Sequence, residues 1–133
     1  MRQYITPAQL QELTDEQKER LRDWWEVWEG DRFFAKDLWE DIAGESGPGC
    51  VESFDCEGLS CKKENCLPLL SVGQCIELLE EKDPGSWSIC CSKSGGRYIT
   101  SSNLYAPKYY IADGGKDFEE IIDALWEAVK AVL

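Results

Sequence analysis

The sequence predicts one α+β domain over residues 1–133: a helical N-terminus, a small antiparallel β-meander packed by helices, and an amphipathic C-terminal helix. Three observations lead to this prediction. Helix-start signals occur four times, β-type segments lie between the last two of them, and 133 residues fit one domain of common size. The hydrophobic content of 43%, with six Trp, supplies enough apolar side chains for a core, so composition does not predict a disordered chain.

Each helix start has a side chain that can accept a hydrogen bond from a free backbone amide of the first turn. Three starts are capping boxes with Gln three residues later, and the fourth has an Asp cap: Thr6 with Gln9, Thr14 with Gln17, Ser71 with Gln74, and Asp117 with Glu120. These four positions therefore predict four helices.

Apolar side chains follow three of these starts at helical spacing. The stripes are Leu21, Trp24, Trp25 and Trp28; Val72, Cys75, Ile76 and Leu79; and Phe118, Ile121, Ile122, Leu125, Val129 and Val132, with Trp126 at the edge. The last stripe is the longest, so we expect the final helix to be a principal core element. We expect it to pack with the Ser71 helix on one face of the sheet.

The predicted strands lie between the last two helices. Residues 86–92 alternate in polarity, 94–96 form a Gly-containing turn, and 97–102 are β-branched and aromatic. Residues 108–112 supply a third strand. An antiparallel meander is the simplest arrangement of these segments.

Residues 30–66 allow two interpretations at their start. Arg32–Ala35 is either a short strand, which we favour, or part of an amphipathic helix that continues to Ile42. Residues 44–66 are rich in Gly, Cys and acids and predict a flexible loop, with a candidate strand at 50–54.

Some segments carry a resemblance. The stretches LPLLSVGQCIELL at 67–79 and DALWEAVK at 123–130, with YITP at 4–7 and the Leu21 to Trp25 segment, resemble small uncharacterised proteins encoded in phages and prophages of Gram-positive, clostridia-like bacteria. Residues 44–66 have no counterpart in them. The resemblance implies an accessory gene of a mobile element and a cytoplasmic compartment, and it implies no reaction.

Charge and composition exclude several functions. The formal net charge is −12 and histidine is absent, so the chain cannot build a Ser-His-Asp triad or a histidine-ligated zinc site. An acidic chain lacks the basic footprint that nucleic-acid phosphates and anionic membranes require. The N-terminus has no apolar signal region and no apolar run long enough to span a membrane follows, so we expect a cytoplasmic protein.

Four cysteines are the candidate metal ligands: Cys50, Cys56, Cys61 and Cys66. Thiolates are suitable ligands for a tetrahedral zinc ion. Structural zinc sites usually contain C-x2-4-C pairs; here the spacings are x5, x4 and x4, so no C-x2-C pair occurs and only the x4 gaps reach the edge of that range. A Cys-loop zinc-binding domain is therefore one hypothesis, with a disulfide or plain thiols as the alternatives.

A thiol- or carboxylate-dependent enzyme is a weaker hypothesis. Cys90 and Cys91 should point to opposite faces of a strand, and no histidine is available to activate either thiol. The many carboxylates are most simply the solvated faces of helices. We therefore identify no catalytic residue and no cofactor-binding residue.

The leading hypothesis is a non-enzymatic protein-interaction module. Four of the six Trp lie between residues 24 and 39, and adjacent Trp24 and Trp25 cannot both bury fully on one helix face. Exposed Trp among acids suits a contact with a partner protein, which the charge suggests is basic. The candidate partner-binding residues are Trp25, Trp28 and Trp39.

Overall fold

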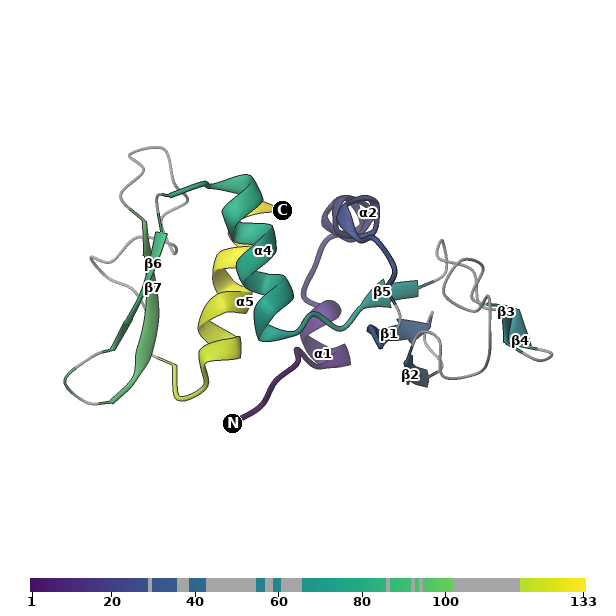
Figure 1. Cartoon of the computed structure of the whole chain (residues 1–133), viewed down its shortest axis with the longest axis horizontal. Helices are drawn as coiled ribbons and strands as arrows, with labels where there is room; N and C mark the ends of the chain where they lie inside the picture. The colour runs from purple at the N-terminus through teal and green to yellow at the C-terminus, as the bar shows by residue number, and fades with distance from the viewer. Residues whose placement is uncertain are drawn as a thin grey trace. The chain divides into compact units, whose positions relative to one another are not determined.

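The protein forms two compact units in a computed structural model. The structure describes residues 1–28, 30–35, 39–42, 55–56, 59–60, 66–85, 87–91, 93, 95–101 and 118–133. Unit 1 consists of Met1–Ile5 and Ser71–Leu133, and unit 2 is Thr6–Leu70 (Figure 1). Both contain helices and antiparallel strands, so the α+β fold class is confirmed. The assignment of residues 1–133 to a single domain stays a prediction.

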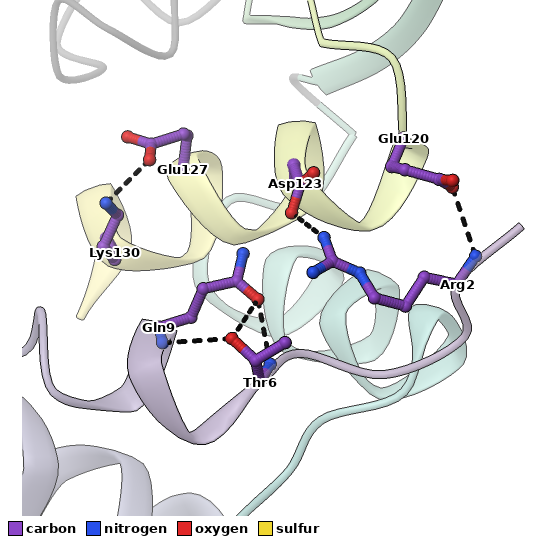
Figure 2. Close-up of polar contacts among 7 residues, drawn as sticks. All are labelled: Arg2, Thr6, Gln9, Glu120, Asp123, Glu127 and Lys130. Carbon is purple, nitrogen blue, oxygen red and sulfur yellow. Dashed lines mark hydrogen bonds and ion pairs between the residues drawn. The ribbon is translucent and has the colours of Figure 1, made fainter.

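Unit 2 begins with two helices, α1 (Pro7–Leu10) and α2 (Asp15–Trp24), and both start at the predicted capping boxes. The backbone amide of Gln9 donates to Thr6 Oγ1 at 3.3 Å, and the side-chain oxygen Gln9 Oε1 accepts from the backbone amide of Thr6 at 2.9 Å (Figure 2). The Thr14 box repeats this pattern at 3.2 and 3.0 Å. Each box satisfies two backbone donors that a helix start leaves free.

The end of α2 differs from the sequence prediction. The stripe of Leu21, Trp24, Trp25 and Trp28 requires a helix that reaches Trp28, but α2 ends at Trp24. Trp25 takes extended dihedral angles (φ −71°, ψ 113°), although its amide still donates to Leu21 O at 3.0 Å. The physical reason is a set of hydrogen bonds to Asp31, described below, which competes with the next helical turn.

The sheet of unit 2 has the order β2-β1-β5 and is antiparallel throughout. Its strands are β1 (Arg32–Ala35), β2 (Trp39–Ile42) and β5 (Cys66–Pro68). The strand interpretation of Arg32–Ala35 is therefore confirmed, and the helical one is wrong.

Two short strands, β3 (Asp55–Cys56) and β4 (Leu59–Ser60), pair with each other inside the predicted loop. The candidate strand at 50–54 lies outside the described residues. None of β2, β3, β4 and β5 was predicted as a strand from the sequence.

One cluster of the unit 2 core consists of Trp25, Phe33 and Cys66, each at most 2% exposed. The Trp25 and Phe33 rings lie 6.4 Å apart between centroids. Helix α2 packs beside β5, and Arg22 Nε donates to the Cys66 carbonyl at 3.2 Å. This cluster thus joins the end of α2 to strands β1 and β5.

Unit 1 is built around α5 (Ile121–Val132), which lies between a hairpin and α4 (Val72–Lys82) (Figure 1). The hairpin consists of β6 (Trp87–Cys91) and β7 (Arg97–Ser101), as predicted. The Ser71 capping box is also present: the Gln74 amide donates to Ser71 Oγ at 3.2 Å. The core side chains are Ile5, Cys75, Leu78, Leu79, Ile99, Ile122, Ala124, Leu125, Trp126, Ala128, Val129 and Leu133.

Three predictions for unit 1 need correction. Helix α5 begins at Ile121, because the Phe118 backbone is paired with Arg97 at 2.7 and 2.8 Å. Glu120 is therefore the N-cap, without a side-chain cap bond, and the predicted start at Asp117 is wrong. Trp126 is 1% exposed, so it belongs to the centre of the apolar face. Helix α4 packs chiefly on α5 rather than on the sheet. The third strand at 108–112 and Asp117 itself lie outside the described residues.

The first five residues belong to unit 1. Tyr4 forms a backbone bridge with Ser71, and the Val72 amide donates to Gln3 O at 3.0 Å. The Arg2 guanidinium pairs with Asp123, and the Arg2 amide donates to Glu120 at 3.2 Å (Figure 2). Unit 2 is thus an insertion in the sequence of unit 1, and the chain leaves and re-enters unit 1 beside this bridge. Within the described residues no helix is long and apolar enough to cross a membrane.

Candidate functional site

The candidate site is the turn that follows α2, formed by the described residues of 25–31 and called the Trp28 turn below. One carboxylate oxygen of Asp31 accepts two hydrogen bonds, from Trp25 Nε1 at 2.9 Å and from the Trp28 amide at 3.0 Å. The Asp31 amide donates to the Trp28 carbonyl at 3.0 Å. Gly30 has φ +92°, a conformation that glycine adopts without strain. Both the amide and the carbonyl of Trp28 are therefore held by Asp31.

Trp25 anchors this turn from the inside. It is 1% exposed, packs against Phe33, and its indole N–H needs a buried acceptor, which Asp31 supplies. Val27 is partly buried against the same cluster. The turn is consequently attached to the core of unit 2 by two side chains as well as by its own hydrogen bonds.

Trp28 points outward from this anchored turn. It is 67% exposed, far more than is usual for a side chain of this size. Burial alternates along the segment, with Trp25 and Val27 inside and Glu26 and Trp28 exposed. In extended backbone such alternation places side chains two apart on the same side. Glu26 and Trp28 are both exposed and are separated by one residue, the partly buried Val27.

The charge around Trp28 is mainly negative, with one base, Arg22 or Arg32, at each end of the segment. Residues 23–31 contain four acids, Asp23, Glu26, Glu29 and Asp31, and no base. Asp23 and Glu26 are exposed and Asp31 is half-buried, while Glu29 lies outside the described residues. The exposed indole ring of Trp28 is thus near the exposed carboxylates of a segment in which acids outnumber bases.

The three predicted partner-binding residues are in different places. Trp28 is on the surface. Trp25 lies in the core, where it holds the turn that carries Trp28. Trp39 begins β2, where it pairs with Ala35, and its side chain lies outside the described part of the structure. The expectation that Trp24 and Trp25 cannot both be fully buried is met, because Trp24 is only partly buried.

The four predicted zinc ligands are described only in part. Cys66 is 1% exposed in the unit 2 core, and the Cys56 backbone lies in β3. Cys50 and Cys61 fall outside the described residues. No group of three or more potential metal ligands occurs among the side chains that are described. The zinc hypothesis stays a prediction.

The remaining described thiols differ in exposure. Burial raises the pKa of the Cys75 thiol to about 12, so this side chain remains neutral at physiological pH. Cys90 is half-buried, with its Sγ 3.9 Å from Thr100 Oγ1, and the adjacent Cys91 is exposed. This difference is the one expected for neighbours on a strand.

Sequence reasoning missed the role of Asp31. The pair Gly30-Asp31 indicates the end of a helix, but which side chains Asp31 would bind depends on the position of Trp25. Comparison of the chain with protein-family models, with curated proteins and with solved structures finds no match. The resemblance to phage-encoded proteins therefore stays a prediction.

Proposed function

We propose that the protein is a non-enzymatic protein-interaction module and that Trp28 is its principal contact. The observation that carries this proposal is a Trp at 67% exposure on a turn fixed by Asp31. Trp residues are enriched among the few interface side chains that supply most of the binding energy. A large apolar ring held in water gains free energy when a partner covers it.

The hydrogen bonds that hold Trp28 support the same proposal. A contact that is already ordered loses less conformational entropy on binding than a mobile one. The Trp28 amide and carbonyl are both engaged by Asp31, and Trp25 ties the turn to Phe33. The negative charge favours a protein partner over nucleic acid or an anionic membrane.

The test is a selection from a random-peptide display library on the immobilised full chain. We expect enriched peptides whose affinity falls at least about tenfold in Trp28→Ala. Ile89→Ala is the matched control, because Ile89 is also a large exposed apolar residue but lies on β6 of unit 1. We expect it to bind the peptides as the wild type does.

Two outcomes would contradict the proposal. One is a selection that enriches no peptide. The other is an enriched set that binds Trp28→Ala as tightly as the wild type. Loss of the fold would not confuse the result, because Trp28 is mostly in solvent and its truncation should leave the urea midpoint unchanged.

A further inference from the structure

We infer that the Trp28 turn binds an arginine-containing, cationic segment of a partner protein, with the guanidinium stacked on the Trp28 ring and paired with the Glu26 carboxylate. This inference rests on the proposed function and specifies the chemistry of the partner. It follows from the exposure of two side chains, their separation by a single residue, and the local charge.

Glu26 lies two positions before Trp28, and both side chains are exposed. Trp25 has extended dihedral angles, and along residues 25–28 the side chains of Glu26 and Trp28 are exposed while those of Trp25 and Val27 are buried or partly buried. Two residues along an extended chain correspond to about 6–7 Å. A planar cation that covers the ring of Trp28 is therefore within reach of the carboxylate of Glu26.

The chemistry favours a cation over a neutral ligand. The face of a Trp ring attracts a cation more strongly than that of Tyr or Phe. The four acids of residues 23–31 outnumber the two flanking bases, Arg22 and Arg32, and add attraction of the same sign. An apolar segment without charge would cover the ring but would not pair with the exposed carboxylate of Glu26.

Arginine fits better than lysine. Its guanidinium is planar, so it can stack on the indole while its N–H groups donate in the ring plane to a carboxylate. A lysine ammonium is a compact, strongly hydrated charge that cannot stack. We therefore expect both cations to bind, with arginine tighter.

The experiment uses the most enriched peptide from the selection described above, synthesised in three forms. One form keeps its arginines, one has lysine in their place, and one has citrulline, which keeps the shape of arginine without its charge. We expect affinity for the full chain to fall at least about tenfold with citrulline and by a smaller factor with lysine. We also expect the affinity of the arginine form to fall as salt is added.

Matched carboxylate variants locate the interaction. Glu26→Gln should weaken the arginine form and leave the citrulline form unchanged. Glu80→Gln is the control, since Glu80 is also an exposed acid but lies within α4 in unit 1. We expect this variant to bind all three forms as the wild type does.

The outcomes separate this inference from the proposed function. Enriched peptides that depend on Trp28 but lack arginine, or whose citrulline form binds equally well, overturn the inference and leave the interaction module standing. A selection with no Trp28-dependent peptide overturns both.

Discussion

At the scale of single residues, Asp31 determines the conformation of the Trp28 turn, because one of its oxygens accepts from both the Trp25 indole and the Trp28 amide. In Asp31→Ala the buried indole N–H loses this acceptor, so we expect the free energy of unfolding to fall by about 1–3 kcal/mol. Asp31→Asn keeps an acceptor oxygen and should lose less. Urea unfolding followed by Trp fluorescence measures both, and an alanine variant as stable as the wild type would contradict this role.

Cys75 gives the protein a pH dependence in the alkaline range. Burial raises the pKa of its thiol from 9.0 in the unfolded chain to about 12, so the native state keeps a proton that the unfolded state releases. The contribution of this thiol to the free energy of unfolding is fully present below pH 9. It is lost as the pH rises toward 12, at about 1.4 kcal/mol per pH unit. Cys75→Ala lacks this titration.

The measurement is urea unfolding of the wild type and of Cys75→Ala at several pH values above 9. We expect the stability advantage of the wild type to shrink as the pH rises. An advantage that stays constant would show that the thiol titrates alike in both states.

At the scale of elements, the Ser71 cap is the local signal for α4. The Ser71 hydroxyl accepts from the Gln74 amide, so Ser71→Ala should cost about 1 kcal/mol of stability, measured as a lower urea midpoint. Ser71→Thr retains the hydroxyl and should remain close to the wild type. Equal stability of the alanine variant would mean that α4 is held by packing alone.

The elements also explain which parts of the fold were predictable. The three capping boxes were found because each joins side chains to amides only three residues away. The start of α5 was missed because Phe118 pairs with Arg97, which is distant in the sequence. Strand β5 was missed because it has three residues, all buried, and pairs with β1 more than thirty positions earlier. In the site, exposure of Trp28 was foreseen as a hypothesis, but burial of Trp25 depends on Phe33 and Asp31.

At the scale of the whole molecule, the division into two units predicts separate local unfolding. Ile122 lies in the core of unit 1 and Phe33 in the core of unit 2. Ile122→Val and Phe33→Leu are mild truncations, with an expected cost of about 0.5–1.5 kcal/mol for the first. We expect each to accelerate amide hydrogen exchange only within its own unit.

The first five residues give this experiment a distinctive feature. Because the backbone of residues 3 and 4 pairs with Ser71 and Val72, amides at the N-terminus should respond to Ile122→Val, although the next helix in the sequence should not. Exchange that accelerates to the same extent in both units, with either variant, would show that the chain unfolds as one body.

The central claim is that Trp28 is the contact through which this protein binds a partner. Its most direct test is a two-dimensional ¹H–¹⁵N NMR titration of the full chain with the enriched arginine peptide, which observes all six Trp indoles and the backbone amides together. We expect the largest shifts at the Trp28 indole and at the amides of the Trp28 turn, with those of α5 unchanged. The largest shifts on β6 or α5, with an unmoved Trp28 indole, would contradict the claim.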